Sequence, residues 1–367
     1  DLQSLTLNNA LRAQVDSAAS GFVLQSPDRA VRAQAIDTLL AHTDTASRPI
    51  VDAARKHETD AALRAKLDLL WANLALDDGS HAEKLEALKL LANDTDPQTR
   101  QRLLPLLAPK TRLICTLRDG AAPSELASWL TQQGFGASQL NIMERLGGPQ
   151  QRLRTAQADG FDLDDIQAPV AVAITALGRG GLSRASGLAD DMFHSDGQIT
   201  KRPIRALTLS ALAPRPGQLL WDIGGGSGSI SVEWCLAAPG ARALIFEQRT
   251  QRSENINLNA AKFGLTHRMS LVTGQAPKIL EAQELPDTVF IGGGASQALL
   301  DQLWHILPSG TRVVANGVTL ETETLLMTAH AQHGGHLMKA EIAEVSPLGS
   351  MRGWQRARPV LQWSVTR

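Results

Sequence analysis

The chain has 367 residues, of which 43% are hydrophobic and 20% are charged, and its formal net charge is −1 at pH 7. This length is typical of two or three domains, and this composition is typical of a globular protein. The small net charge excludes a global electrostatic field that attracts nucleic acid or a membrane surface. The two cysteines, Cys115 and Cys235, lie far apart, which excludes a disulfide framework and a cysteine zinc site.

The sequence pattern indicates neither a membrane-spanning segment nor a signal peptide. Its longest apolar stretch, residues 169–177, is too short to cross a bilayer. We therefore expect a cytoplasmic location and no membrane partner. Because the chain begins at Asp1 rather than Met, we also expect a fragment or a processed product.

Residues 1–107 are predicted to form an all-α, HEAT-like module. Apolar residues recur at helical spacing, for example from Leu63 to Leu74, and helix-start signals stand at Thr59-Asp60 and at Asp94–Pro97. The alanine, leucine and arginine pattern weakly resembles the soluble N-terminal region of urea-type ABC permeases. No chemistry is expected here, so we interpret the module as a packing or interaction element.

Residues 108–178 change character, with candidate strands at 112–117, 140–144 and 169–175 and a helix at 123–133. The run from Glu144 to Pro149, with the helix start at Ala122-Pro123, resembles the C-terminal half of a tetrapyrrole methylase of the C5-methylating kind. The glycine-rich N-terminal half of that family is missing. We therefore predict a partial domain that cannot methylate by itself, followed by a linker at 179–192.

Residues 193–367 are predicted to form a Rossmann-like α/β methyltransferase domain. A strand at 217–222 leads into the glycine loop 224–228 and a helix, and further strands are expected at 243–246, 269–272, 288–291 and 311–316. The alternating D-x-G-x-G-x-G pattern favours S-adenosylmethionine over a nicotinamide dinucleotide, whose pyrophosphate requires another glycine spacing. Structural turns without a ligand remain the alternative interpretation of these glycines.

The predicted cofactor site gathers residues that follow the first three of these strands. Asp222 is expected to orient the methionine portion, and Glu247 to accept hydrogen bonds from both ribose hydroxyls. Residues after the third strand are expected to flank the adenine. The candidate cofactor-binding residues are Asp222, Gly224, Gly226, Gly228, Ser229, Glu247, Gln248, Gly274, Gln275 and Ala276.

Several runs in the C-terminal half resemble the decarboxylating precorrin-6B C15-methyltransferases, among them residues 193–202, 271–277, 316–323 and 347–354. Together with the upstream C5-type signature, they point to the two-domain precorrin-6Y C5,15-methyltransferase family. The resemblance implies methyl transfer to C15 of a precorrin or cobalt-precorrin and decarboxylation of its ring-C acetate, in cobalamin biosynthesis. It also implies a homo-oligomer, a tetramer. The family often has alanine where Gly225 stands, a change expected to loosen the loop slightly without removing a contact.

A tetrapyrrole substrate carries many carboxylates, which arginine recognises well. The basic residues at the two ends of the domain are therefore candidates, although each one alone is equally explained as a solvated charge. Asn316, at the end of the fifth strand, binds substrate or merely caps its loop. The candidate substrate-binding residues are Thr200, Lys201, Arg202, Arg205, Asn316, Arg352, Arg356 and Arg358.

No residue presents itself as the catalytic acid or base for decarboxylation, and that role stays unassigned. No metal is expected, since His333 and His336 have no acidic or cysteine partner at ligand spacing. A methyltransferase acting on RNA or protein is a rival, but residues 292–294 are glycines where such enzymes often have N/D-P-P-[YF], and nucleic acid is not an expected partner. A non-enzymatic helical scaffold with a degraded methylase is the second rival.

Overall fold

The computed structural model describes residues 23–41, 47–78, 80, 83, 86, 102–281 and 283–367. The chain divides into two compact units, which part near residue 181. Within the described residues no helix is long and apolar enough to cross a membrane. The helix start predicted at Asp94–Pro97 lies outside the described residues.

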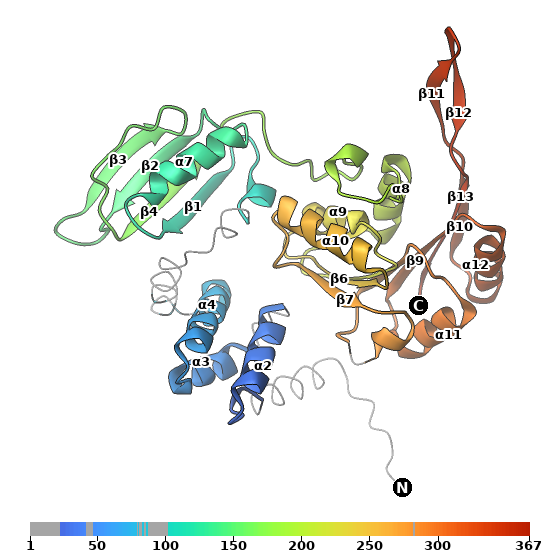
Figure 1. Cartoon of the computed structure of the whole chain (residues 1–367), viewed down its shortest axis with the longest axis horizontal. Helices are drawn as coiled ribbons and strands as arrows, with labels where there is room; N and C mark the ends of the chain where they lie inside the picture. Colours follow the sequence, from blue (N-terminus) through green and yellow to red (C-terminus); the bar gives the residue numbers. More distant parts are fainter. Residues whose placement is uncertain are drawn as a thin grey trace. The chain divides into compact units, whose positions relative to one another are not determined.

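Three N-terminal helices pack on a small core of their own (Figure 1). They are α2 (Arg29–Ala41), α3 (Arg48–His57) and α4 (Ala61–Asp78). Asp60 caps α4, since its Oδ1 accepts hydrogen bonds from the backbone N–H groups of Ala62 and Leu63, each at 3.0 Å. The apolar side of α4 is buried from Leu63 to Leu74 as its spacing predicts. Stacking of these helices as HEAT repeats stays a prediction.

The middle segment is a four-stranded antiparallel sheet in the order β1-β4-β2-β3, with one helix on it. Its elements are β1 (Arg112–Leu117), α7 (Ala122–Gln132), β2 (Gln139–Glu144), β3 (Arg152–Gln157) and β4 (Val170–Thr175). Alternate residues of β2 and β4 are buried, as period-2 patterning requires. The strand β3 was not predicted, because its sequence alternates arginine with residues that stay exposed at a sheet edge.

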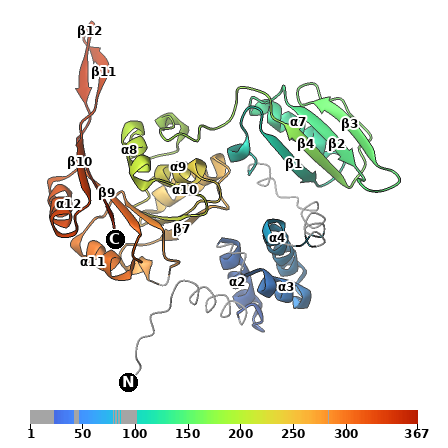
Figure 2. The same cartoon turned by 180° about the vertical axis from the view of Figure 1, so that it is seen from behind.

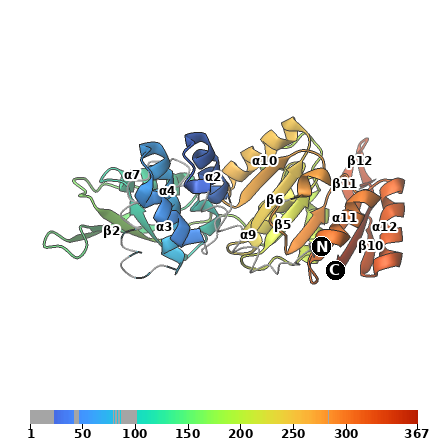
Figure 3. The same cartoon turned by 90° about the horizontal axis from the view of Figure 1, so that it is seen from below.

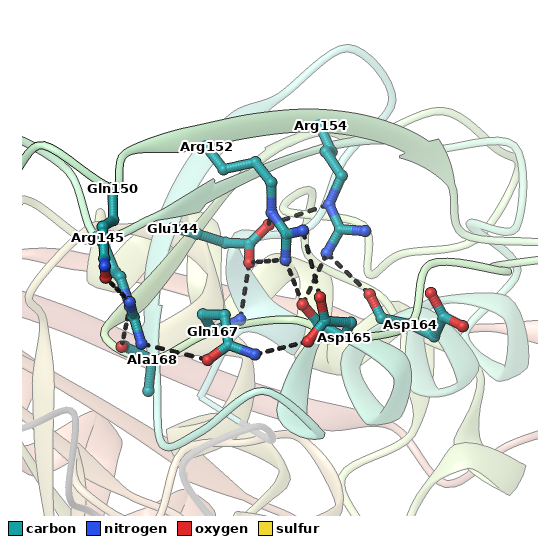
Figure 4. A network of polar contacts seen from close by, with 9 residues as sticks. All are labelled: Glu144, Arg145, Gln150, Arg152, Arg154, Asp164, Asp165, Gln167 and Ala168. Carbon is teal, nitrogen blue, oxygen red and sulfur yellow. Dashed lines mark hydrogen bonds and ion pairs between the residues drawn. The ribbon is translucent and has the colours of Figure 1, made fainter.

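Glu144 organises the end of this sheet (Figure 4). Its side chain is buried and accepts hydrogen bonds from Arg152, from Arg154 and from the backbone N–H of Gln167, at 2.7–3.0 Å. The two arginines also donate to backbone carbonyls of the loop at Asp164 and Asp165. Burial alone raises the pKa of Glu144, but the hydrogen bonds from Arg152, Gln167 and Arg154 outweigh it and hold the pKa at about 2. Glu144 therefore has a structural role, because it and its two arginines hold the loop at residues 164–167 against the sheet.

Replacing Glu144 by glutamine is expected to lower the free energy of local unfolding of β2, β3 and the loop 158–169 by about 3 kcal/mol at neutral pH. The reason is that two arginines lose the buried carboxylate that they bind. The folded-state pKa lies below the ordinary value, so this stabilisation is present above pH 4.5 and is lost as the pH falls toward 2. Hydrogen exchange of the β2 and β3 amides measures the effect locally. Asp164→Asn, an exposed change that keeps the backbone carbonyl, is the matched control. Equal protection in wild type and Glu144→Gln at pH 7 would contradict the role of Glu144.

The second unit is built on a seven-stranded sheet in the order β10-β13-β9-β8-β5-β6-β7. The central strands are parallel, and β13 runs antiparallel to both of its neighbours. The strands are β5 (Leu219–Ile223), β6 (Arg242–Glu247), β7 (Met269–Thr273), β8 (Thr288–Ile291), β9 (Arg312–Gly317), β10 (His336–Ala340) and β13 (Val360–Thr366). The five predicted strands are present as β5 to β9, in a Rossmann-like sheet of the class I methyltransferase type.

Helices cover both faces of this sheet (Figure 3). Buried residues of α8, α9 and α10 form one core, and those of α11 and α12 form the other. The helices are α8 (Arg202–Leu212), α9 (Ser229–Ala237), α10 (Thr250–Lys262), α11 (Gln297–Ile306) and α12 (Leu320–His333), and the short 3-10 turns are η2 (Leu104–Leu106), η3 (Asp190–Met192) and η4 (Lys278–Leu280). Glu321 and Glu323 lie in the first turn of α12, where acids suit the helix dipole.

Two further strands, β11 (Ala343–Leu348) and β12 (Met351–Arg356), form an arm that extends from β10 and β13 (Figures 1 and 2). The arm starts beside the carboxyl end of β9, because Leu361 of β13 pairs with Gly317. No strand was predicted beyond residue 316, so both the arm and the antiparallel edge of the sheet were missed.

The predicted linker is not free along its whole length. The backbone N–H groups of Gly187 and Leu188 donate to the carboxylate of Glu233 on α9, at 2.7 and 2.9 Å. Leu188 itself is buried in the core beneath α8 and α9. The glycines and serines of residues 179–192 predict a flexible linker, but residues 187–192 pack against the second unit as part of its fold.

Candidate active site

The glycine loop joins β5 to α9 at the carboxyl edge of the parallel strands, where ligands bind in open α/β sheets. Gly224, Gly226 and Gly228 all have positive φ, between +60° and +73°. A side chain at Gly224 would also come within 2.7 Å of the carbonyl oxygen of Gly293, which follows β8. The backbone can take this course only with glycine, and it leaves the loop open to a ligand.

Asp222 lies at the end of β5 and is 1% exposed. Its Oδ2 accepts a hydrogen bond from the hydroxyl of Ser231 at 2.6 Å, whereas Oδ1 is buried and accepts none from any described residue. Burial raises the pKa of Asp222 to about 6, the charge of Glu247 adds to the rise, and the bond from Ser231 opposes it. A buried carboxylate oxygen without a donor is costly, and a ligand bearing N–H groups or positive charge would satisfy it.

Glu247 ends β6 on the other side of the loop and is buried. Its Oε2 accepts from the backbone N–H of Gly226 and its Oε1 from that of Arg249, both at 2.9 Å. Each oxygen keeps a second lone pair, so the carboxylate is held in place and can still accept from a pair of hydroxyls. This geometry suits the ribose contact predicted for Glu247.

The remaining predicted cofactor residues surround these two carboxylates. Gly274 follows β7, and its N–H donates to the carbonyl of Glu247 at 2.9 Å, which places the turn at Gly274, Gln275 and Ala276 beside the end of β6. Gln248 is exposed next to Glu247, and Ser229 is the first residue of α9. The structure thus brings all ten predicted cofactor residues to one edge of the sheet.

Gly225 differs from the expectation that it merely loosens the loop. A Cβ at this position would lie 2.2 Å from Cγ2 of Ile245 on β6. The side chain of Ile245 therefore occupies the space that an alanine methyl would need, and the two positions fit each other as a pair.

Gly225→Ala is expected to destabilise the second unit by about 1–3 kcal/mol, because an extra methyl is forced into a packed site. Adding Ile245→Leu, which removes the branch at Cβ, is expected to restore part of the loss. Urea unfolding of the single and double variants measures this coupling. An alanine at position 225 that costs nothing on its own would contradict the packing of Ile245 against the loop.

Three of the candidate substrate residues lie at the carboxyl edge, at the start of α8. This helix runs antiparallel to β9, because Arg312 at the start of β9 donates to the carbonyl of Leu212 at the end of α8, at 2.9 Å. Thr200, Lys201 and Arg202 therefore lie beyond the carboxyl end of β9, and the last two are exposed. Arg202 is available to an anionic ligand, whereas Lys201 also forms a loose ion pair with Asp190, at 3.9 Å.

Asn316 is held in a polar network that sequence reasoning did not find. Its Nδ2 donates to the hydroxyl of Thr208 on α8 at 2.9 Å, and its Oδ1 accepts from Gln362 on β13 at 3.0 Å. Gln362 also donates to Thr208 at 3.2 Å. Neither Thr208 nor Gln362 belongs to a motif near Asn316 in the chain, so only the fold brings them together. The network fixes the orientation of the Asn316 amide.

Arg205 is too deeply buried to contact substrate, so the prediction that it binds substrate is wrong. The side chain is 0% exposed, and its guanidinium donates to Glu233 at 2.6 Å, to Asp190 at 3.0 Å and to the carbonyls of Leu188 and Thr200. It also lies 4.7 Å above the ring of Phe193. Lys201 caps the exposed start of α8, whereas Arg205 lies one turn farther along, where α9 and residues 188–200 cover it.

The three C-terminal arginines are spread along the arm rather than gathered at one site. Arg358 lies between β12 and β13, near the carboxyl edge, whereas Arg356 pairs with Ala343 farther out and Arg352 pairs with Pro347 near the tip. All three are exposed. Of the three, Arg358 is therefore the one that lies nearest the carboxyl edge of the sheet within one chain.

Among the described residues, no group of three or more His, Cys, Asp or Glu side chains could hold a metal ion. The thiols of Cys115 and Cys235 are both free. Burial raises the pKa of Cys115 to about 11, so this thiol stays protonated at neutral pH.

Comparison with known proteins bears on the second unit. A family model described as a precorrin methyltransferase domain matches residues 191–367. A probable cobalt-precorrin-6B C15-methyltransferase (decarboxylating) of Saccharolobus solfataricus is 35% identical over 165 residues, 43% of this chain and 82% of that protein. The chain belongs to the precorrin methyltransferase family. Methyltransferases of this family use S-adenosylmethionine, and the buried Oδ1 of Asp222, the open glycine loop and the two free lone pairs of Glu247 fit that cofactor.

The similarity extends upstream of the family model. The precorrin-6Y C5,15-methyltransferase (decarboxylating) of a Sinorhizobium species is 45% identical over 267 residues, 72% of this chain, and the chain spans 64% of that relative's length. A solved C-terminal domain of precorrin-6Y C5,15-methyltransferase from Rhodobacter capsulatus is 59% identical, with a TM-score of 0.49 over 51% of this chain and 100% of that one. These relatives lend no support to the likeness between the N-terminal helices and permeases.

Proposed function

We propose that this chain transfers a methyl group from S-adenosylmethionine to C15 of a precorrin or cobalt-precorrin and removes the carboxyl group of the ring-C acetate, as in cobalamin biosynthesis. The observation that carries the proposal is the pair of buried carboxylates, Asp222 and Glu247, on either side of a glycine loop in a precorrin methyltransferase domain. The name of the Saccharolobus relative supports the C15 position.

The chain's own residues hold and orient the cofactor. When bound, S-adenosylmethionine supplies an electrophilic methyl group on a sulfonium. Asp222 orients the methionine portion directly or through water, Glu247 accepts from the ribose hydroxyls, and residues 274–276 flank the adenine. The sulfonium and the amino group of the ligand carry positive charge, which suits the negative charge of Asp222. No basic side chain among the described residues forms an ion pair with Asp222.

The substrate is expected to lie over the carboxyl ends of β8 and β9. Its carboxylates would meet Lys201 and Arg202 at the start of α8 and Arg358 at the base of the arm, with Thr200 and Asn316 as polar contacts. A meso carbon of a reduced tetrapyrrole is an electron-rich, enamine-type nucleophile, so attack needs no strong base. Alignment of this carbon with the methyl group then supplies most of the rate enhancement, an effect worth several kcal/mol, up to ~7–11 kcal/mol. The group that assists decarboxylation stays unassigned.

The middle sheet is proposed to be inert in methylation on its own. Its buried carboxylate, Glu144, accepts hydrogen bonds from Arg152, Arg154 and a backbone N–H, and these contacts hold it within the sheet rather than toward a ligand. C5 methylation would need residues outside this segment. We therefore assign one cofactor site to the chain, in the second unit.

Calorimetry of S-adenosylmethionine binding tests the proposal, on the full chain and on residues 186–367, with Asp222→Ala and Glu247→Ala as controls. One site of equal affinity in both, lost in the controls, is the expected result. Two sites on the full chain would overturn the inert middle sheet, and no binding would overturn the enzyme. Incubation with a precorrin-6-type substrate then separates the reactions, because methylation adds 14 mass units and decarboxylation releases CO2.

A homo-oligomer is also proposed, with the arm as its contact. Val345, Leu348, Met351 and Trp354 are 56–75% exposed on β11 and β12, and Val345 is paired with Trp354 on one face. Large apolar side chains on an isolated two-stranded ribbon are typical of a surface that another chain covers. Light scattering of the full chain is expected to give a tetramer, and Trp354→Glu is expected to give smaller species.

We also propose a cytoplasmic location, because the proposed substrate is a metabolic intermediate and both thiols are free.

A further inference from the structure

A backbone segment, residues 194–200, runs beside the glycine loop and connects it to the substrate-facing start of α8. The carbonyl oxygen of Gln198 would lie 4.0 Å from a side chain placed at Gly226. Ile199 packs against the buried core formed by α8, α9 and α10. The segment then leads directly into Thr200 and Lys201. We call residues 194–200 the strap.

Asn259 on α10 joins this strap to the glycine loop. Its side chain is 0% exposed. Its Oδ1 accepts from the backbone N–H of His194 at 2.8 Å, while its Nδ2 donates to the carbonyl of His194 at 2.9 Å and to the carbonyl of Ser227, within the glycine loop, at 2.8 Å. Both amide hydrogens and the amide oxygen are thus used, and they bind two backbone segments 33 residues apart.

A second contact holds the strap about two turns earlier on the same helix. Arg252 forms an ion pair with Asp196 at 2.8 Å and also donates to the side chain of Gln198. Both charged side chains are partly exposed, so this contact is the weaker one. The two contacts hold the strap against α10 at both ends of the stretch that borders the loop.

We propose that Asn259 is a positioning residue that couples the methyl-donor site to the substrate site, an inference that rests on the proposed function. Its three hydrogen bonds hold the glycine loop in the conformation that binds S-adenosylmethionine. The same bonds hold the strap, and with it Thr200 and Lys201, in register with that loop. Without them the strap must be ordered when the cofactor binds, and this ordering weakens affinity.

The test compares Asn259→Ala with Asn257→Ala, an exposed neighbour on the same helix. Hydrogen exchange of the amides of residues 194–200 reports the strap, and calorimetry reports S-adenosylmethionine binding. Asn259→Ala is expected to speed exchange in the strap and to weaken binding at least 10-fold, while Asn257→Ala changes neither. An Asn259→Ala protein with wild-type exchange and wild-type affinity would overturn the proposal. Failure of the proposed function itself is recognised separately, because the wild-type chain would then bind no cofactor.

A second variant covers the case in which Asn259→Ala fails to fold, as judged by near-UV circular dichroism. Asp196→Asn removes the exposed ion pair and leaves Asn259 in place. Faster exchange at residues 196–200 together with weaker cofactor binding, by about 2- to 5-fold, supports the coupling. Faster exchange with unchanged binding would overturn it, because the strap would then move without consequence for the cofactor. Unchanged exchange and unchanged binding would also count against it.

Discussion

Asp222→Asn is expected to weaken S-adenosylmethionine binding by roughly 100-fold, about 2–3 kcal/mol, because the buried site loses the charge that meets the cationic ligand. The hydroxyl of Ser231 can still donate to the asparagine oxygen, so the packing is kept. Calorimetry at pH 7.5 measures the loss. Wild-type affinity in this variant would remove Asp222 from the cofactor site.

The same variant is expected to be more stable than the wild type when no cofactor is present. The folded-state pKa of Asp222 is raised from 3.8 to about 6, so the ionised carboxylate destabilises the folded protein above that pH. The cost is at most about 3 kcal/mol, it appears as the pH rises from about 4 to 6, and it is absent below pH 4. Urea unfolding at pH 7.5 is therefore expected to favour Asp222→Asn.

Cofactor binding inherits a pH dependence from this carboxylate. Below pH 6 the wild type must give up a proton from Asp222 to bind a cation, so its affinity is expected to fall by up to about tenfold per pH unit. The variant Asp222→Asn is expected to show a flat profile between pH 5 and 7. A wild-type affinity that does not change over this range would contradict the raised pKa.

Arg205→Met is expected to destabilise the second unit by about 3–5 kcal/mol, because the change leaves the carboxylate of Glu233 buried without its cation. Glu233 is 2% exposed and would keep only the N–H groups of Gly187 and Leu188. Arg205 also holds Asp190 and the carbonyl of Thr200, so residues 188–200 are expected to loosen with it.

Chemical denaturation, followed by the fluorescence of the buried tryptophans Trp221 and Trp234, measures this loss. Arg202→Met on the same helix is the matched control, since Arg202 is exposed, and it is expected to change stability by less than about 0.5 kcal/mol. Arg205→Met combined with Glu233→Gln is expected to recover part of the stability, because a neutral amide replaces the unpaired charge. A cost below 1 kcal/mol for Arg205→Met alone would contradict a structural role.

Local patterns in the chain predicted most of the candidate cofactor site. The glycine spacing after Asp222 requires a turn with positive φ, and an acid at the end of the next strand must reach the same edge of a parallel sheet. Those constraints are visible in the short pattern at each strand end, so the sequence alone could predict β5 to β9 and the ten residues that gather at one edge of the sheet. The likeness to precorrin methylases was visible for the same reason, in short runs such as residues 193–202.

Contacts between distant segments were decided only by the tertiary structure. Arg205 looked like Lys201 and Arg202 in the sequence, but the phase of α8 turns it onto Glu233, 28 residues away. The partners of Asn316 come from α8 and β13, and those of Asn259 come from the strap and the glycine loop. Burial and long-range pairing depend on how helices pack on the sheet, and no spacing along the chain encodes that packing. The sequence therefore predicted which residues gather at the glycine loop, and the fold decided which polar side chains stay exposed near the carboxyl edge of the sheet.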